Sequence, residues 1–458
     1  MQVYESVTDA IGHTPLFRLN HVDVPAPIYV KAEFLSIGGS VKDRAALAMV
    51  EQAERDGSLR PGGIIVEATS GNTGIGLALV GRQRGYRVVI GVSDKAAREK
   101  VDILKAYGAE ILLATTGVPL EHPDHLFNVV RKLVDQTPGA WLADQYDNPA
   151  NPDVHVRTTG PEIWQQTDGR VTHFVAGVGT GGTISGTGRY LKDVSNGAVT
   201  VVAADPASSA YSGGDGSPYW VESIGHSIHP ETLQDHWPDS FHPDVVDRYE
   251  RIPDRESLLT ARALGRTEGL LVGASSGAAI AAALRVARDL TPDDLVVVLL
   301  PDSGRSYLSK SLSDDWLRYW GFLEEPGVTV RSALGDMVEK LPTLPATAVV
   351  RDVLERFPEA VPAGAVPVVV PREERPFGVA AAEIVGSVSP GRLRADGSLS
   401  PDAPIRDLLD PPLPAIGVGE PVQDALAALG DHDSAVVLED GRALTLVTRA
   451  QLASAARP

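Results

Sequence analysis

Short runs of apolar, mostly β-branched residues alternate with helix-like segments between about residues 60 and 320. Strands that are apolar throughout are typical of a parallel sheet with helices on both faces. The alternation therefore predicts an α/β fold with doubly wound sheets. The expected strands lie at residues 63–66, 88–92, 109–114, 174–176, 200–204 and 295–300.

The segment GGSVKDR, Gly38 to Arg44, places Lys42 in the first turn of an expected helix, behind two glycines. The positive end of a helix dipole disfavours an ammonium group, and partial burial lowers a lysine pKa further. Such a lysine suits Schiff-base chemistry. A surface lysine at a helix start is the alternative that this segment alone leaves open.

Two glycine-rich segments follow expected strands and begin expected helices: TSGNTGIG, Thr69 to Gly76, and GTGGT, Gly179 to Thr183. Exposed backbone N–H groups and hydroxyls in such turns bind carboxylates or phosphates. Neither segment matches the dinucleotide or Walker pattern, so a nucleotide site is a poor interpretation. A tight strand-to-helix turn is the structural alternative for both.

Ser303 in LPDSGRSYLSK lies just past the last expected strand, where open α/β sheets present their ligand crevice. Its hydroxyl is placed to face a ring nitrogen, or else to cap a helix. The histidine pairs His122 with His125 and His226 with His229 lie beside prolines and have no third ligand nearby in sequence. We therefore expect no metal site.

The charge balance excludes several classes of protein. The chain has 41 Lys plus Arg against 60 Asp plus Glu, a net charge of −19, which disfavours partners such as nucleic acids or anionic membranes. The chain has no cysteine, which excludes disulfides and thiolate ligands. Without a signal peptide or a long apolar run, we expect a soluble, cytoplasmic protein.

Beyond about residue 323 the chain becomes rich in Pro, Val and Ala. Two shorter units recur there weakly, each with an initial segment, an apolar helix and a pair of strands. The first expected strand pair joins residues 368–370 to 378–379. The second joins residues 435–438 to 445–447.

The motifs GGSVKDR, TSGNTGIG, GTGGT and LPDSGR, in this order, resemble those of the fold-type II pyridoxal-phosphate enzymes, in the group of cysteine synthase and cystathionine β-synthase. The stretches IGHTPL, EKVDILKAYGAE and DQYDNPANP support the resemblance. It implies a catalytic domain over residues 1–323, built from two doubly wound sub-domains, and a linker over 324–333. Residues 334–458 resemble a diverged pair of CBS motifs, a small α+β module for regulation or assembly.

The resemblance also implies roles for individual residues. Lys42 would hold pyridoxal 5′-phosphate as an aldimine and act as the catalytic base. The other cofactor ligands would be Asn72 at the 3′-oxygen, Ser303 at the ring nitrogen, and Gly179, Thr180, Gly181, Gly182 and Thr183 at the phosphate. The amino-acid substrate would be bound by Thr69, Ser70, Gly71, Thr73, Gln145 and Gly225.

The implied activity is β-replacement, in which L-serine and L-homocysteine give L-cystathionine through an aminoacrylate intermediate. A serine hydroxyl cannot keep the pyridine ring protonated, so the ring is a weak electron sink and loss of a β-substituent is favoured. The alternatives are cysteine synthesis from O-acetylserine and sulfide, or synthesis of another β-substituted alanine. A third interpretation, from another class, is a non-catalytic protein that senses a ligand. Such a protein would have no need to combine Lys42, Asn72 and Ser303. The partners implied are amino-acid and thiol substrates and further copies of the chain, as a dimer or tetramer.

Several loops on the expected substrate side depart from the family pattern. Ala68 replaces a usual proline, and Ser223 replaces a usual glycine. Arg98 and His226 are candidates for recognising an unusual nucleophile, with neutral drift as the alternative. These departures leave the donor and the nucleophile open.

No haem is expected, because IGHTPL begins at residue 11 and thiolate ligation is impossible without cysteine. Adenosine-binding CBS motifs usually carry a threonine followed three positions later by an aspartate. The second repeat has Gln451 three positions after Thr448, and the first repeat, GVAAAEIV, lacks the threonine. We therefore expect weak or absent binding of S-adenosylmethionine or AMP.

Overall fold

The computed structural model describes residues 3–93, 96–335, 338–358, 361 and 363–456. The chain forms two compact units. The first comprises the described residues up to Gly216 together with Val221–Leu312, and the second comprises Ser217–Trp220 and the described residues from Ser313 onward. The expected domain bounds, with a catalytic domain over residues 1–323 and a linker over 324–333, stay a prediction.

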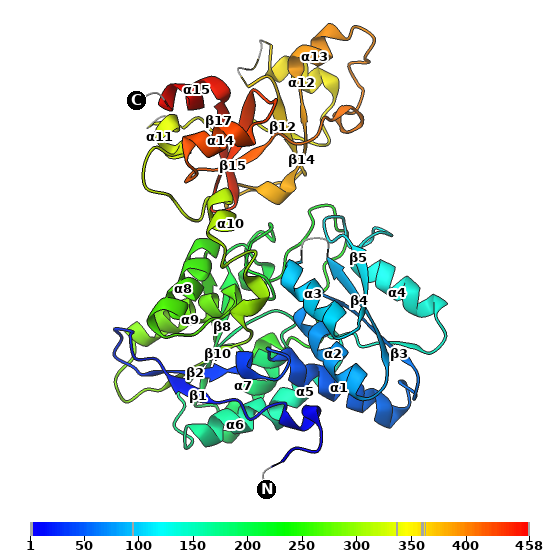
Figure 1. Ribbon diagram of the computed structural model, residues 1–458, viewed down its shortest axis with the longest axis vertical. Coiled ribbons are helices and arrows are strands. Elements are labelled where there is room, and N and C mark those ends of the chain that lie inside the picture. Colours follow the sequence, from blue (N-terminus) through cyan, green and yellow to red (C-terminus); the bar gives the residue numbers. More distant parts are fainter. Residues whose placement is uncertain (1–2, 94–95, 336–337, 359–360, 362, 457–458) are drawn as a thin grey trace. The chain divides into compact units, whose positions relative to one another are not determined.

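The first unit contains two largely parallel sheets (Figure 1), which confirms the predicted α/β fold. Each of the six expected strands is present. The larger sheet has the order β1(Leu16–Arg18), β2(Ile28–Ala32), β10(Val296–Leu300), β7(His173–Gly177), β8(Thr200–Pro206) and β9(Arg248–Ile252), and only β1 is antiparallel to its neighbour. The smaller sheet has the order β5(Glu110–Ala114), β4(Arg87–Ser93), β3(Ile64–Thr69) and β6(Ala140–Leu142), all parallel.

The smaller sheet shows why its strands are apolar throughout. Successive side chains of a strand point to opposite faces, so Ile65 of β3 packs in one cluster with α2(Asn72–Gln83). Val66 packs in another cluster with α4(Leu126–Gln136). Helices therefore bury both faces of the sheet, as in a doubly wound fold. The remaining helices of the first unit are α1(Lys42–Asp56), α3(Arg98–Ala106), α5(Ala150–Arg157), α6(Thr159–Gln166), α7(Gly182–Val194), α8(Asp254–Thr267) and α9(Ala274–Arg288).

Three of the segments selected from the sequence follow the C-terminal ends of parallel strands. TSGN joins β3 to α2, GTGGT lies between β7 and α7, and Asp302 and Ser303 follow β10. Ligands bind at this edge of open α/β sheets. The fold therefore supplies the setting in which these segments form one site.

The second unit contains two small sheets. One has the order β11(Leu344–Pro345), β12(Val366–Val369) and β14(Ile384–Val388), and the other has the order β13(Val379–Ala380), β17(Arg442–Thr448), β16(Ser434–Glu439) and β15(Ala415–Gly417). The helices of this unit are α10(Asp314–Tyr319), α11(Val330–Leu334), α12(Val350–Arg356), α13(Pro390–Ala395), α14(Val422–Ala428) and α15(Arg449–Ala455).

One of the two strand pairs expected in this unit is confirmed and the other is wrong. The pair at residues 435–438 and 445–447 is the antiparallel pair β16 and β17. Strand β12, however, pairs with β14, and β13 pairs with β17 of the other sheet. The segment between β12 and β13 contains Pro371 and Pro376, which lack the N–H that a hairpin ladder needs. The first half of the repeat therefore contributes strand β13 to the sheet of the second half.

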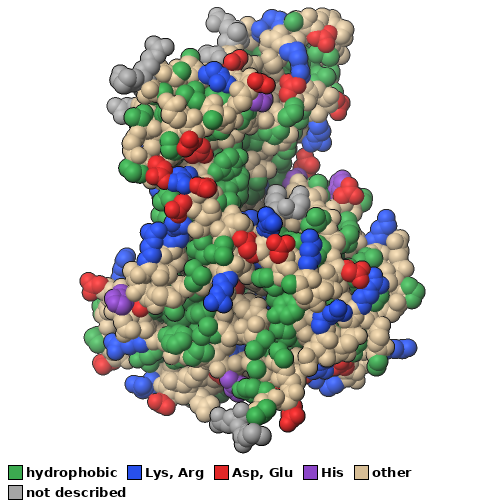
Figure 2. All heavy atoms as spheres, viewed as in Figure 1, with side chains coloured by type: hydrophobic (Ala, Val, Ile, Leu, Met, Phe, Trp, Pro, Cys, Tyr) green, Lys and Arg blue, Asp and Glu red, His purple; other side chains and the backbone are tan. Residues whose placement is uncertain are grey.

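Acidic and basic side chains are interspersed on the face that Figure 2 shows. Within the described part of the chain, every helix is too short or too polar to cross a bilayer.

Candidate active site

A cavity open to solvent, with about 470 Å³ of empty space including its mouth, lies in the first unit, among the C-terminal ends of β7 and β10 and the first turns of α1, α2 and α7. It brings together residues of four separate motifs, GGSVKDR, TSGNTGIG, GTGGT and LPDSGR. The cavity is lined by Val41, Lys42, Asn72, Gly177, Gly179, Thr180, Gly181, Thr183, Ser223, Ile224, Leu299 and Pro301.

Lys42 is the first residue of α1 and its side chain enters this cavity. Its Nζ donates to the Thr180 hydroxyl at 3.4 Å. Burial lowers the pKa of Lys42 to about 8 from the ordinary 10.5, although the carboxylates of Glu67 and Asp302 oppose the shift. An amine with a pKa this low is partly unprotonated at neutral pH and is available as a nucleophile or base.

The glycines of the GTGGT segment form a cradle with no room for a side chain at their positions. Gly181 has φ +83°, and a Cβ there would lie 2.3 Å from the Phe241 Cβ. A Cβ on Gly182 would lie 2.3 Å from the Asn151 Oδ1. Helix α7 begins at Gly182 with no side-chain cap, so its first N–H groups remain available to an anion.

Two buried side chains behind this cradle were missed by sequence reasoning. Asn151 Nδ2 donates to the Thr180 Oγ1 at 3.0 Å, and His155 Nε2 lies 3.2 Å from the Thr183 Oγ1. Burial, with the charges of Arg44 and Lys42, lowers the pKa of His155 well below its usual range, so the ring is neutral. The stretch DQYDNPANP contains Asn151, but nothing in its local pattern marks that residue.

The structure brings together two of the expected substrate ligands from distant segments. The Thr73 hydroxyl donates to Gln145 Oε1 at 2.5 Å. Thr69 accepts the Gly71 N–H at 3.1 Å and so shapes the turn, while Ser70 is exposed. The backbone N–H of Gly225, the remaining expected ligand, donates to the Val178 carbonyl at 2.6 Å. The substrate role of all six residues stays a prediction.

Ser303 follows β10 as expected, and its hydroxyl accepts the N–H of Arg305 at 3.3 Å. This is the helix-capping contact that the sequence left as an alternative. Its backbone N–H donates to the Gly39 carbonyl, which ties the PDS segment to the GGSVKDR segment. Contact with a ring nitrogen stays a prediction.

A partly buried ion cluster beside the TSGN turn was also missed. Lys100 of α3 is fully buried, and its Nζ lies 2.9 Å from the Glu222 Oε2. The Glu222 Oε1 lies 2.6 Å from the Lys310 Nζ. The Lys100 stem packs so closely on Gly71 that a Cβ there would lie 2.5 Å from its Cδ. The cluster therefore joins three segments that are distant in sequence.

Of the residues that depart from the family pattern, some line the cavity and others do not. Arg98 is 87% exposed and pairs with Asp102, and His226 pairs with Asp235 at 2.7 Å. Neither is among the cavity-lining residues, whereas Ser223 is. Ser223 has φ +76°, a strained conformation for a residue with a side chain.

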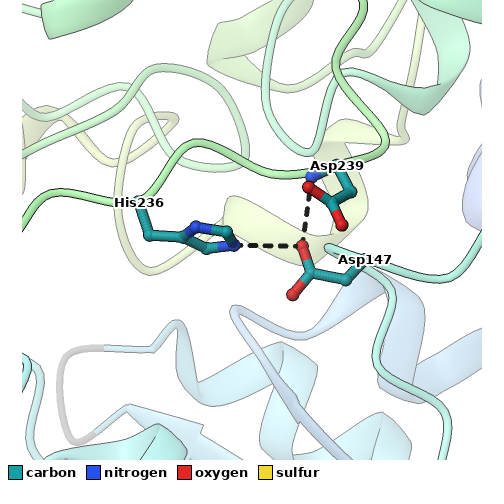
Figure 3. A group of neighbouring side chains, drawn as sticks. All are labelled: Asp147, His236 and Asp239. Atoms are coloured by element: carbon teal, nitrogen blue, oxygen red, sulfur yellow. Dashed lines mark hydrogen bonds and ion pairs between the residues drawn. The ribbon is translucent and has the colours of Figure 1, made fainter.

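The histidines considered from the sequence contact other groups. His125 caps α4, and His122 lies 3.9 Å from Asp124. A different group brings the possible ligand atoms of Asp147, His236 and Asp239 within 4.8 Å of one another (Figure 3). Asp147 Oδ1 accepts from the His236 Nε2 at 3.4 Å and from the Asp239 backbone N–H at 3.1 Å. These hydrogen bonds are sufficient to hold the group together.

Two solved structures resemble the chain at the level of fold and sequence. A hydrogen sulfide-producing enzyme from Fusobacterium nucleatum has a TM-score of 0.62 at 33% identity, covering 67% of this chain and 100% of that one. A mutant of O-ureido-L-serine synthase with O-ureido-L-serine bound has a TM-score of 0.62 at 35% identity, covering 69% and 98%.

Among curated proteins, cystathionine beta-synthase of Apis mellifera is 42% identical over 332 residues, covering 70% of this chain. The chain spans 64% of the length of that relative. The sequence profile of the family described as pyridoxal-phosphate dependent enzyme matches residues 7–302. This chain belongs to the pyridoxal-phosphate dependent enzyme family.

Proposed function

We propose that the chain catalyses β-replacement, condensing L-serine with L-homocysteine to give L-cystathionine. The observation that carries the proposal is the single cavity in which Lys42, the GTGGT cradle and Asn72 meet. The 42% identity to a cystathionine beta-synthase supports the choice of substrates. A homo-oligomer, dimer or tetramer, is part of the same proposal.

The residues of the cavity fit pyridoxal 5′-phosphate. The cradle excludes a Cβ at Gly181 and Gly182, and the uncapped start of α7 offers N–H donors to a phosphate. Lys42 supplies the amine that would hold the cofactor. When bound, the cofactor supplies an electron sink for the substrate Cα.

The chain's own residues would then perform three tasks. Lys42, with its lowered pKa, would remove the proton from the substrate Cα and return it after the thiol has added. Thr73 and Gln145, already hydrogen-bonded to each other, would bind the α-carboxylate. Asn151 would hold the Thr180 hydroxyl in place beside the Lys42 amine.

The lowered pKa of Lys42 predicts the pH dependence of cofactor capture by the cofactor-free protein. Only the unprotonated amine attacks the cofactor carbonyl, so the rate follows titration near pH 8. We expect the rate to rise about fivefold from pH 7 to pH 8 and less than about twofold from pH 8 to pH 9. Stopped-flow absorbance measures it. A steady rise of about tenfold at each step would mean that Lys42 has its ordinary pKa.

The alternative functions differ in donor and nucleophile. The similar solved structures include an O-ureido-L-serine synthase and a hydrogen sulfide-producing enzyme, and the strained Ser223 alters the cavity wall. Both observations are reasons to test O-acetylserine as a donor, and sulfide and other nucleophiles, beside L-serine and L-homocysteine.

The experiment that tests the proposal incubates cofactor-loaded protein with L-serine or O-acetyl-L-serine, each combined with homocysteine or sulfide. Mass spectrometry identifies the products, and the Lys42→Ala variant is the matched control. Cystathionine from serine as the preferred product supports the proposal. A product only from O-acetylserine and sulfide would assign the chain to cysteine synthesis. Failure of all four pairs would contradict both assignments.

We also propose that the second unit is a diverged CBS pair with a regulatory or assembly role. Glu383 is buried, and its carboxylate contacts Arg372 Nε at 2.9 Å and Arg375 Nη1 at 2.5 Å. In the second half, the Gln451 side chain accepts the Thr448 backbone N–H at 2.8 Å. Glu383 stands three positions after Ala380, as Gln451 does after Thr448, so under this proposal both positions that correspond to the ribose-binding aspartate are engaged by the chain itself.

These contacts predict the behaviour of the full chain toward adenosine ligands. We expect AMP and S-adenosylmethionine to bind more weakly than about 1 mM, because Glu383 is neutralised by two arginines. Isothermal titration calorimetry measures this, with the Arg375→Ala variant for comparison. A saturable heat with the wild-type chain at micromolar ligand would contradict the prediction.

A further inference from the structure

Asp302 is a buried acid for which the proposed reaction has no assigned task. It follows β10 directly and is 1% exposed. Its Oδ2 accepts the Asn72 Nδ2–H at 2.7 Å and also a short hydrogen bond from the Tyr307 hydroxyl. Its Oδ1 is buried and has no hydrogen-bond partner in the described structure. A Cβ on Gly273 would lie 2.3 Å from that oxygen.

This geometry favours the ionised form of Asp302. Two donors converge on Oδ2, so this oxygen must accept and cannot carry a proton of its own without losing one of them. A proton on Oδ1 would be a buried donor without an acceptor, which is costly. Burial raises the pKa of Asp302 above its ordinary value, and the positive charge of Lys100 and the two hydrogen bonds oppose that rise. The Lys100 Nζ lies 4.3 Å from the centre of the Tyr307 ring.

An ionised Asp302 determines the orientation of the Asn72 amide. A carboxylate only accepts hydrogen bonds, so the amide atom that faces it must be the nitrogen. The reverse orientation would place the amide oxygen against the carboxylate oxygen. Asn72 therefore has one N–H committed to Asp302 and one N–H left, and its side chain lines the cavity beside Lys42.

We propose that Asp302 is a positioning residue, which acts through Asn72 to present an N–H donor to the 3′-oxygen of the cofactor. This inference rests on the proposed position of the cofactor in the cavity. A donor at this oxygen stabilises its deprotonated form, and the proton then stays on the nitrogen that joins Lys42 to the cofactor. Asp302 thereby sets the protonation of the cofactor before any substrate binds.

The test uses the absorption spectrum of the cofactor-loaded protein without substrate. In Asp302→Asn we expect the long-wavelength band, from the deprotonated 3′-oxygen, to fall about tenfold relative to the short-wavelength band, the size of one charge-assisted hydrogen bond. Asn72→Ala should give the same change, and the double variant should add nothing further. Tyr307→Phe removes only the second donor to the Asp302 Oδ2 and keeps the Asp302 to Asn72 contact, so it should lower the ratio less than Asp302→Asn does.

A second measurement separates positioning from structural damage. Dissociation constants are measured by fluorescence for pyridoxal 5′-phosphate and for its analogue without the 3′-oxygen. Asp302→Asn should weaken binding of the normal cofactor only, whereas a damaged cavity would weaken both equally. If Asp302→Asn does not accumulate as folded protein, Asp302→Glu replaces it, because the added methylene displaces the same carboxylate. Asp302→Glu should likewise weaken binding of the normal cofactor only.

Three results would overturn the proposal: an unchanged spectrum in Asp302→Asn, additive changes in the double variant, or equal loss of affinity for both cofactors. Each measurement is made without substrate. Wild-type protein that binds the cofactor but forms no β-replacement product would therefore contradict the proposed function and leave this test intact.

Discussion

Replacing Lys42 by alanine is expected to reduce turnover by about 1,000-fold or more, because one side chain would lose both its covalent hold on the cofactor and its role as a base. The lysine lines the cavity, and burial holds its pKa near 8. Steady-state product formation measures the loss.

The Lys42→Ala variant should nevertheless stay folded. The side chain makes one long hydrogen bond, to Thr180 at 3.4 Å, so its removal takes little from the packing. Circular dichroism and thermal unfolding check this. The control is Lys105→Ala, which makes the same substitution at an exposed position on α3. Substantial β-replacement by a folded Lys42→Ala variant would show that another group is the base.

Replacing Gly181 by alanine is expected to weaken cofactor binding about 100-fold or more. The steric clash of the new Cβ and the backbone strain at a positive φ both contribute to the loss. The new Cβ would lie 2.3 Å from the Cβ and 2.5 Å from the Cα of Phe241. Either the cradle or the segment holding Phe241 must move, and the N–H groups proposed to receive the phosphate move with it. Titration of cofactor-free protein measures the affinity.

Gly197 provides a matched control for Gly181. Its φ of +82° is nearly the same as the +83° of Gly181, but a Cβ there meets nothing within 4 Å. Gly197→Ala therefore isolates the backbone strain, about 1 kcal/mol of stability, and should leave cofactor affinity unchanged. Equal cofactor affinities in the two variants would show that the close approach at Gly181 is unimportant for the cradle.

The sequence was most informative where the signal is local. A run such as VVVLL in β10 is apolar because both faces of the strand are buried, and that requirement is visible within five residues. The segments at Lys42, Asn72 and Gly179–Thr183 combine glycines and hydroxyls over a few positions, and the structure brings them into one cavity. These features follow from short-range backbone geometry, which adjacent residues determine.

Pairings across long sequence distances were not predictable in the same way. Strand β13 pairs with β17 although β12 is its neighbour in sequence. The contacts of Lys100 with Glu222 and of Asn72 with Asp302 join residues 122 and 230 positions apart. Nothing in the surrounding sequence pattern distinguishes Lys100 from an exposed lysine. Its burial depends on which distant segments pack against the TSGN turn in the folded chain.

The sequence alone thus determined the α/β class, six of the ten strands that the structure describes in the first unit and the segments proposed to hold the cofactor, since each depends on local periodicity or on glycine-rich turns. Only the tertiary structure decided which carboxylate holds Asn72, which cation neutralises Glu222 and how the strands of the second unit pair. Those choices depend on desolvation and on the closeness of distant segments, which arise only when the chain has folded.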